Sequence, residues 1–377
     1  MPRLLHASLR PNPGVLLVLG GSAAAGFGYR HWTNSKDASS SSSAAAAESA
    51  TLHPLRFAHY AIADRAPVSS TSTLFTLRAR DGPATAQQDL RDIWARCVWS
   101  VEAKQPQLQI ARAYTPLPPP TTTTDDEETD GGTTDASQLR FLIRRERAGE
   151  VSNYLHRLPP GAAVELRGPH VAFEIPDDVT EVLFLAGGTG IAPALQVARA
   201  LQMREGREAS RMRILWANRR REDCAGGRSD DDVATQGSGW GSWLGWGSGK
   251  KGRKEQDAGV PTATTTTTTG GEDGLVVREI DALKRRAGAA QQRLAVDYFV
   301  DEEKTFIQPS HVARHLQEAS KSGEKSPGSR LILISGPDGF LDYWAGRKIW
   351  AEQGEVQGPL RGALSKMDLK GWRVWKL

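Results

Sequence analysis

The segment Val182-Leu183-Phe184-Leu185-Ala186-Gly187-Gly188-Thr189-Gly190-Ile191-Ala192-Pro193 decides the fold that this sequence predicts. Its first four residues form a short apolar run typical of a buried strand, and the glycines that follow break that run. A helix is expected from about Leu195 to Gln202, and Pro193 suits its first turn because a missing N–H costs nothing there. A helix start reached through glycines presents unpaired N–H groups and a positive dipole end to phosphate. The segment therefore predicts a nucleotide-binding turn.

From residue 181 onward, strand-like and helix-like stretches alternate. Strands are expected at residues 182–185, 212–217, 294–300 and 331–335, and helices at 194–202, 280–287, 310–318 and 341–353. Alternation of this kind predicts an α/β domain, residues 178–377, with helices on both faces of a parallel sheet. Ligands of such sheets bind at the carboxyl ends of the strands. The turns after Leu185 and after Ile334 are therefore expected to line one crevice.

The chain before this domain is divided into short strand-like runs. They lie at residues 56–63, 73–80, 95–101, 108–114, 139–145 and 163–167, with one helical piece at 151–158. Six short strands predict a small antiparallel β-barrel over residues 55–177. The whole chain is thus expected to hold two domains, an antiparallel β-barrel followed by an α/β domain with a parallel sheet.

Two stretches interrupt the predicted domains with compositions that do not pack. Residues 116–136 are rich in Pro, Thr and Asp, and residues 225–274 contain a Thr run. Both are expected to be disordered inserts, because such segments bury too little apolar surface to fold. The second insert also holds Trp240, Trp243 and Trp246 just before several lysines, and contact with an anionic membrane interface is the alternative interpretation for it.

Charge and cysteine content exclude several classes of site. The formal net charge is +4 over 377 residues, and no basic stripe interleaved with aromatic residues marks a nucleic-acid-binding module. Cys97 and Cys224 are the only cysteines, too few for a disulfide framework or a four-thiolate metal site. The eight histidines show no HxxH or HExxH spacing. We expect neither a nucleic-acid partner nor a metal centre.

The first 36 residues form a basic leader. They carry four Lys or Arg residues and no acidic one, as suits mitochondrial import. The uncharged stretch 11–29 is near the lower length limit for a membrane span. Three interpretations follow: a mitochondrial signal with an inner-membrane anchor, a cleaved soluble presequence, or a secretory signal. Residues 37–54 are a Ser/Ala-rich tether.

A short motif, Arg112-Ala113-Tyr114-Thr115-Pro116, ends one predicted barrel strand. Arg112 offers a fixed fork of donors that suits a pyrophosphate. Two residues further along the strand, Tyr114 points to the same face and can lie against a planar ring. An exposed arginine and a packed tyrosine at a strand end are the alternative interpretation.

A second motif, Gly149-Glu150-Val151-Ser152, stands at the start of the predicted helix 151–158. Ser152 can cap that helix. The same helix start, with Gly149 beside it, can also hold an anion. If Arg112 faces this helix start across the barrel, the two hold one pyrophosphate from two sides.

Taken in order, these motifs resemble those of the ferredoxin–NADP reductase superfamily, in particular its cytochrome b5 reductase branch. The resemblance rests on RxYT at 112–115, GxVS at 149–152, RGP at 167–169, GGTGIAP at 187–193 and GPxG at 336–339. Within that branch, the N-terminal segment and the runs 112–118, 149–161 and 371–377 look most similar to the fungal mitochondrial cytochrome c import factor family. The turn at Gly187 differs from the GxGxxG fingerprint, since Ala192-Pro193 replaces its third glycine.

The resemblance implies a cofactor, FAD, and a coenzyme, NADH or NADPH, with a role for each motif. Arg112 binds the flavin pyrophosphate, Tyr114 packs by the ribityl chain and ring, and Thr115 bonds the flavin edge near its reactive nitrogen. Further phosphate contacts fall to Gly149, Val151 and Ser152. The nicotinamide nucleotide falls to Gly187, Gly188, Thr189, Gly190 and Pro193, with Gly336 and Pro337 closing the site. The superfamily often places an aromatic residue near Trp375 against the flavin, and a packed edge-strand Trp is the alternative.

The implied function is a membrane-anchored flavoprotein oxidoreductase of the mitochondrial inner membrane, with its domains in the intermembrane space. Electrons pass from NAD(P)H through FAD to a one-electron acceptor, a haem or a c-type cytochrome. Ser335 stands where most of the superfamily has Cys, so ring juxtaposition and hydride transfer are expected to suffer. Two alternatives remain: a cytochrome b5 reductase-type enzyme, and a non-catalytic FAD-binding assembly factor for cytochrome c, which Ser335 favours. Arginines 219–221 followed by Glu222-Asp223 leave the choice of coenzyme open.

Overall fold

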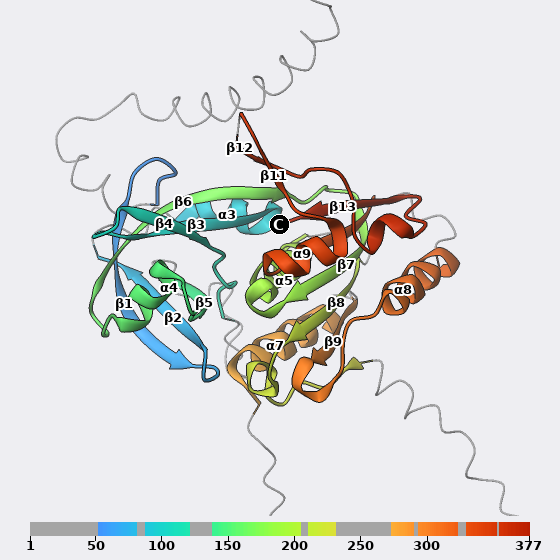
Figure 1. The fold of residues 1–377 in the computed structure, drawn as a ribbon, viewed down its shortest axis with the longest axis horizontal. Coiled ribbons are helices and arrows are strands. Elements are labelled where there is room, and N and C mark those ends of the chain that lie inside the picture. The colour runs from blue at the N-terminus through green and yellow to red at the C-terminus, as the bar shows by residue number, and fades with distance from the viewer. Residues whose placement is uncertain are drawn as a thin grey trace, which may run out of the picture. The chain divides into compact units, whose positions relative to one another are not determined.

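The computed structural model describes residues 52–80, 87–120, 138–204, 210–230, 273–289, 293–322, 329–352 and 354–377 (Figure 1). The leader 1–36 and the greater part of the tether and of both predicted inserts lie outside these ranges. Predictions made for those segments, including the membrane anchor and Trp240, Trp243 and Trp246, therefore concern residues that are not described. Within the described ranges, no helix combines the length and the apolar character that a membrane span requires.

The first sheet is antiparallel and six-stranded, as the sequence predicts, in the order β4-β3-β6-β1-β2-β5. Its strands are β1 (Ala58–Pro67), β2 (Ser72–Ala79), β3 (Cys97–Gln105), β4 (Ile110–Tyr114), β5 (Gln138–Arg144) and β6 (Ala163–Glu174). Leu117, just after β4, forms a bridge to Arg140 of β5, its N–H donating to the Arg140 carbonyl at 2.7 Å. The chain thereby joins the two edge strands, and the sheet curls around a core that includes Phe75, Trp99 and Phe141.

Two helices accompany this sheet, and only one of them was predicted. Helix α4 (Glu150–Arg157) matches the expected helix at 151–158. Helix α3 (Gln87–Arg96) was missed, and the strand expected at 95–101 was wrong at its start, since β3 begins at Cys97. Leu90, Ile93 and Trp94 pack on the barrel core at helical spacing. The β-branched and aromatic residues after Arg96 are typical of a strand, and the predicted strand was begun two residues too early, at 95 instead of 97.

The second sheet is parallel and five-stranded, in the order β13-β10-β7-β8-β9. Its strands are β7 (Val179–Gly187), β8 (Arg211–Asn218), β9 (Arg293–Val300), β10 (Ser329–Ser335) and β13 (Trp372–Lys376). Its helices are α5 (Ile191–Gln202), α7 (Leu275–Ala289), α8 (Pro309–Ser322) and α9 (Asp338–Ala345). Buried residues of α5 and α7 pack with Val182 and Phe184, whereas those of α8 and α9 pack with Leu183 and Leu185. Helices therefore cover both faces, as predicted.

The helix expected at 341–353 was wrong over its second half. Helix α9 ends at Ala345 because Gly346 takes a φ of 77°, a left-handed conformation that a helix does not continue. The chain then forms a two-stranded hairpin, β11 (Ile349–Ala351) and β12 (Gly354–Val356), before the final strand β13.

A single glutamine side chain on α5 joins the two sheets. Gln196 is fully buried. Its amide oxygen accepts from the Trp99 N–H at 2.9 Å, and its amide nitrogen donates to the carbonyls of Trp99 at 3.1 Å and of Pro116 at 2.9 Å. Around it, Val98, Leu142 and Phe173 of the first sheet share one buried cluster with α5. Both sheets belong to one compact unit of the chain, residues 50–377.

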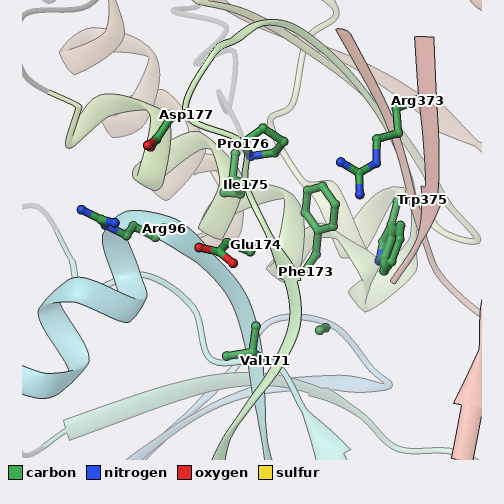
Figure 2. A pocket seen from close by; sticks show the side chains of 10 residues that line it. Arg96, Val171, Phe173, Glu174, Ile175, Pro176, Asp177, Arg373 and Trp375 are labelled. Carbon is green, nitrogen blue, oxygen red and sulfur yellow. The ribbon is translucent and has the colours of Figure 1, made fainter. Parts of the chain in front are cut away.

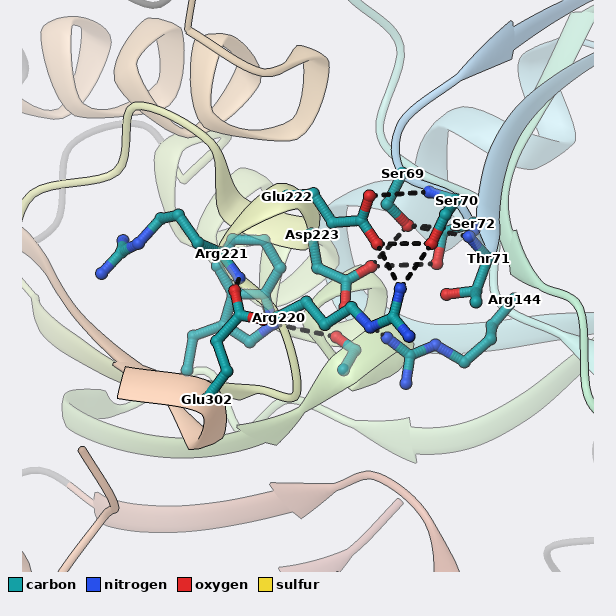
Figure 3. A network of polar contacts seen from close by, with 12 residues as sticks. Ser69, Ser70, Thr71, Ser72, Arg144, Arg220, Arg221, Glu222, Asp223 and Glu302 are labelled. Atoms are coloured by element: carbon teal, nitrogen blue, oxygen red, sulfur yellow. Dashed lines mark hydrogen bonds and ion pairs between the residues drawn. The ribbon is translucent and has the colours of Figure 1, made fainter. Parts of the chain in front are cut away.

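A polar network also crosses this interface (Figure 3). In the turn between β1 and β2, Ser69 donates to the Asp223 carboxylate at 2.7 Å and Ser70 donates to Glu222 at 2.5 Å. Arg144, at the end of β5, pairs with Asp223 at 2.6 Å. Both carboxylates follow β8. The loop that leaves this strand is therefore held against the first sheet.

We expect Gln196→Leu to lower the free energy of unfolding by roughly 3 kcal/mol, because it leaves a buried N–H and two carbonyls without partners. Gln202→Leu, on the same helix, is the matched control. It removes one hydrogen bond, to the Leu283 carbonyl, within the second domain. Its expected cost is about 1 kcal/mol. Denaturant unfolding of both variants measures the difference, and equal losses would contradict the role assigned to Gln196.

Stability is expected to fall with acidification through His156 of α4. Burial lowers the pKa of this ring below its ordinary value of 6.5, and Arg65 and Arg145 lower it further against a hydrogen bond to the Ile143 carbonyl. The unfolded chain therefore binds more protons below pH 6.5, so the stabilisation is complete above 6.5 and is lost as the pH falls. His156→Gln should reduce this pH dependence by a fraction of a kcal/mol, since the ring is only half-buried. Denaturant unfolding across this range, with exposed His59→Gln as the control, measures it.

Candidate functional site

A cleft of about 360 Å³ lies between the two sheets and draws its walls from both. The sequence-predicted residues that line it are Arg112, Tyr114, Thr115, Gly149, Val151, Ser152, Thr189, Gly190, Pro193, Ser335 and Gly336. The structure thus brings together motifs that lie more than 200 residues apart in the sequence. Their roles toward a ligand stay predictions.

The end of β4 supplies one wall. Arg112 is exposed, and its guanidinium donates to the neighbouring Ala111 carbonyl at 3.0 Å. Burial raises the pKa of Tyr114 to about 12, with Glu146 raising it further and Arg112 opposing the shift. The phenol therefore stays neutral at physiological pH and keeps an O–H to donate. A cation and a neutral phenol side by side suit a ligand with both an anionic group and a planar ring.

The start of α4 supplies the facing wall, and Ser152 does not cap it as predicted. Gly149 occupies the N-cap position, and among the described residues no side chain caps the helix. The Ser152 hydroxyl instead accepts from the Glu146 N–H and donates to the Gly149 carbonyl, both at 3.1 Å. These two bonds close the loop before the helix, from Glu146 to Gly149. They leave the first-turn N–H groups without a side-chain cap, because a helix cannot supply partners for those groups itself. The N–H groups of residues 150–152 remain available to an anion.

The third wall is the glycine turn after β7. Gly188 takes a φ of 54°, and residues 188–190 form a single 3₁₀ turn that leads directly into α5. A Cβ on Gly190 would lie 2.3 Å from the Ser335 carbonyl oxygen. The turn therefore packs backbone to backbone against the end of β10, the strand beside β7 in the sheet. This contact places Thr189 and Gly190 next to Ser335 and Gly336.

Three predicted site residues lie behind the cleft wall. A Cβ on Gly187 would meet Phe340 at 3.1 Å and Pro337 at 3.2 Å. Pro337 is the N-cap of α9. Gly188 lines a small neighbouring pocket with Trp216, whose indole N–H donates to the Gly188 carbonyl at 2.9 Å. These three residues thus support the glycine turn after β7 from behind and do not line the cleft.

Trp375 does not line the cleft. Figure 2 shows it beside Phe173 and Arg373 in another groove. It stands on the edge strand β13, with its ring 5.2 Å from that of Phe173 and the Arg373 guanidinium over both rings. These residues line a separate groove of about 490 Å³ that shares no lining residue with the cleft. Of the two interpretations of Trp375, the structure shows the packed edge-strand residue.

The sequence analysis missed Arg144, which lines both the cleft and the pocket behind Gly188. The signal was present, since the paired arginines 144–145 end a predicted strand where a polar loop begins. Arg112 and Arg144 together give the cleft two cations, against the carboxylates of Glu146 and Glu150. Arg144 is already paired with Asp223 behind the cleft, so Arg112 is the cation that is more available to a ligand. The cations, the free N–H groups of α4 and the neutral Tyr114 fit an elongated ligand with a pyrophosphate and an aromatic ring. Within the described ranges, no cluster of three His, Cys, Asp or Glu side chains could hold a metal ion.

Comparisons with known proteins find one match in each of the two domains. A family model described as an oxidoreductase FAD-binding domain matches residues 97–175, and one described as an oxidoreductase NAD-binding domain matches residues 184–233. The chain is 35% identical over 131 residues to the cytochrome c mitochondrial import factor CYC2 of Saccharomyces cerevisiae. It is 29% identical over 154 residues to an uncharacterized FAD-binding protein of Schizosaccharomyces pombe, and 28% identical over 234 residues to NADH-cytochrome b5 reductase 2 of Lodderomyces elongisporus.

These likenesses are partial. They cover 33%, 40% and 59% of this chain, and 34%, 49% and 58% of the three relatives in the same order. The chain therefore matches between about a third and three fifths of each relative's length.

We expect Gly190→Ala to destabilise the protein by about 1–3 kcal/mol, because the methyl group must push the turn away from the Ser335 carbonyl. Gly339→Ala in α9 is the matched control. Its Cβ would meet nothing within 4 Å, and it should stabilise the helix by up to about 1 kcal/mol. Denaturant unfolding of the two variants measures both effects. A Gly190→Ala variant as stable as the wild type would contradict the close backbone packing.

Proposed function

We propose that this chain, which belongs to the ferredoxin–NADP reductase superfamily, is an FAD-containing oxidoreductase. It takes electrons from a nicotinamide nucleotide and passes them singly to an acceptor. The observation that carries the proposal is the single cleft in which Arg112, Tyr114 and the start of α4 face Gly190 and Ser335. One wall comes from the segment that matches the FAD-binding model, and the Gly190 wall comes from the segment that matches the NAD-binding model.

On the flavin side, the residues of the cleft would bind FAD and orient its ring. The Arg112 fork and the free N–H groups at the start of α4 would hold the pyrophosphate, from a side chain and from backbone. Tyr114, neutral because it is buried, would pack along the ribityl chain and ring. Thr115 would bond the flavin edge near its reactive nitrogen. Ser152 would act on the loop geometry through its two internal hydrogen bonds rather than through a direct phosphate contact.

On the nicotinamide side, Thr189, Gly190 and Gly336 would receive the coenzyme over the flavin. FAD, when bound, supplies the chemistry of hydride acceptance and single-electron release. The chain's contribution is the relative placement of the two rings, to which rates of transfer are sensitive. Ser335 is 9% exposed at the end of β10. Its hydroxyl is smaller than the thiol found at this position in most of the superfamily, so it would hold the nicotinamide less closely.

We propose NADH as the favoured coenzyme. Residues 219–223 and 301–303 gather three arginines and five carboxylates after β8 and β9. Arg220 pairs with Glu222 at 3.2 Å, and Arg221 pairs with Glu303 at 2.5 Å. The hydrogen bond to Arg221 lowers the pKa of Glu303, so this carboxylate stays charged. An excess of carboxylates disfavours the 2′-phosphate of NADPH.

The acceptor and the location extend the proposal beyond the cleft. The similarity to the S. cerevisiae import factor and the basic leader support a mitochondrial protein. We propose attachment to the inner membrane through residues 1–36, domains in the intermembrane space, and a haem or c-type cytochrome as acceptor. The similarity to NADH-cytochrome b5 reductase 2 supports a cytochrome b5 reductase-type enzyme as the second candidate. Ser335 supports a third, an assembly factor for cytochrome c that keeps FAD as a structural ligand.

Anaerobic titration of the purified full-length protein tests the proposal. We expect the yellow absorbance of oxidised flavin, and its bleaching by NADH at lower concentration than by NADPH. Arg112→Ala should weaken FAD binding by roughly 10- to 100-fold, the effect of losing a charge-assisted hydrogen-bonding group. Exposed Arg56→Ala, outside the cleft, is the control and should retain the flavin.

The same titration separates the enzyme from the structural alternative. Ser335→Cys should speed bleaching by NADH without changing flavin content, because the thiol restores the side chain usual at this position. A yellow protein that neither nicotinamide nucleotide bleaches, even with Ser335→Cys, would contradict the oxidoreductase proposal and support the assembly factor. Stopped-flow reoxidation with haem, cytochrome c and cytochrome b5 then identifies the acceptor.

A further inference from the structure

Three arginines on three neighbouring helices form a cluster away from the cleft. They are Arg91 of α3, Arg199 of α5 and Arg286 of α7. Helix α5 contacts both α3 and α7 and lies between them in Figure 1. None of the three arginines lines the cleft, and Arg199 stands about 9 Å further along the helix axis than Pro193, at 1.5 Å per residue. The arginine cluster is therefore separate from the proposed flavin site.

Contacts of the residues near Arg199 show that it lies where the three helices meet. Gln202, three positions later on α5, donates to the Leu283 carbonyl of α7 at 2.8 Å. Met203, four positions later, packs on the buried cluster that includes Trp94 of α3. Residues three and four positions apart share a helix face. Arg199 therefore lies on the face of α5 that α3 and α7 border.

The positive charges of the arginine cluster repel one another. Burial lowers the pKa of Arg199 below its ordinary value, and the charges of Arg286 and Arg91 lower it further. The Arg199 side chain is half-buried, whereas Arg91 and Arg286 are exposed. An arginine nevertheless stays charged at physiological pH. The fold thus holds three like charges close together, at a cost in free energy.

Carboxylates of the described residues do not pair with these charges. Among those residues, none of the three guanidinium groups has an ion-pair or hydrogen-bond partner. The carboxylates of α7 lie elsewhere, since Glu279 pairs with Arg140 at 2.5 Å and Asp281 is close to Lys284. Helix α5 carries no acidic residue. On α3, the exposed Asp92 pairs with none of the three arginines.

The helix dipole explains only part of this arrangement. Arg199 and Arg286 lie in the last turns of α5 and α7, where a cation interacts favourably with the negative end of the helix. Arg91 stands in the middle of α3 and gains nothing from this effect. The dipoles also do not require the three charges to converge. An anion bound from outside accounts for the convergence.

Three guanidinium groups suit a phosphate group in particular. Each presents a planar fork of N–H donors that can bind two oxygens of an oxyanion. A carboxylate offers two oxygens and a single negative charge, too few for three forks. A phosphate group offers at least three acceptor oxygens and up to two charges.

We propose that Arg91, Arg199 and Arg286 bind a phosphate-bearing ligand that bridges α3 of the first domain to α5 and α7 of the second. Free phosphates and phospholipid headgroups share this chemistry. The bound ligand offsets the repulsion among the arginines and adds a contact between the two domains. The site lies outside the cleft and does not depend on the flavin proposed there.

Isothermal titration calorimetry of the purified full-length protein, freed of unbound FAD, tests this site. One probe is inorganic pyrophosphate. The other is dihexanoyl-phosphatidylglycerol below its micellar concentration, a lipid that needs no membrane. Two matched variants on α7 separate a defined site from general attraction to a basic surface. Arg286→Gln removes a charge from the arginine cluster, whereas Arg285→Gln removes the same charge one residue earlier, from a side chain close to Asp281.

We expect pyrophosphate, the lipid or both to bind, and the probe that binds identifies the source of the phosphate group. Arg199→Gln and Arg286→Gln should each weaken binding roughly 10- to 100-fold, the effect of losing a charge-assisted hydrogen-bonding group. Arg285→Gln should weaken it much less. Arg199→Lys keeps the charge without the fork, so its affinity should fall between those of Arg199→Gln and the wild type. The ligand that binds should also raise the unfolding temperature of the wild type and leave that of Arg199→Gln unchanged.

Absence of binding by both probes would overturn the proposal. Equal weakening by Arg285→Gln and Arg286→Gln would mean that the phosphate is attracted to a basic surface without a defined site. A pyrophosphate signal that Arg112→Ala removes and Arg199→Gln leaves intact would come from the cleft, and it would also contradict a site at the arginine cluster.

Discussion

The buried amide of Gln196 is the interaction on which the cleft depends. Its three hydrogen bonds connect α5 to the Trp99 backbone of β3 and to the carbonyl of Pro116. Pro116 directly follows Thr115 at one wall of the cleft, and Gln196 stands three residues after Pro193 at another. A movement of either domain would therefore leave buried backbone groups unpaired. That cost holds the motif that ends at Thr115 and the motif that ends at Pro193 in a fixed relative position.

Close backbone packing also fixes the walls of the cleft relative to each other. Gly190 lies so near Ser335 that no side chain fits between them, which makes the ends of β7 and β10 one continuous surface. Arg144 and Asp223 tie the neighbouring loop to the first sheet. The proposed oxidoreductase consists of two half-sites that a rigid interface holds in fixed relation, which matches a protein whose task is ring placement while its cofactors supply the electron chemistry.

The last strand serves two surfaces at once. On one side of β13, Trp375 packs on Phe173 of the first sheet. At its end, Lys376 and Gln357 hold the base of the hairpin β11–β12. The strand pairs with β10 in parallel register, Ile334 beside Lys376. The edge of the sheet therefore connects the interface between the domains, the strand that carries Ser335 and the base of the hairpin β11–β12.

The sequence by itself determined the antiparallel sheet, four of the five strands of the parallel sheet, helix α4 and the motifs that line the cleft. These follow from apolar periodicity and glycine turns, which act over a few residues. The fifth parallel strand, β13, was not among the predicted strands. Helix α3 was missed, and the last helix was extended past Gly346, whose positive φ ends it. Only the tertiary structure decided the roles of Ser152, Gln196, Arg144 and Trp375. Those roles depend on partners elsewhere in the fold, 97 residues away for Gln196 and Trp99, and pairing across such a distance leaves no periodic trace in a single sequence.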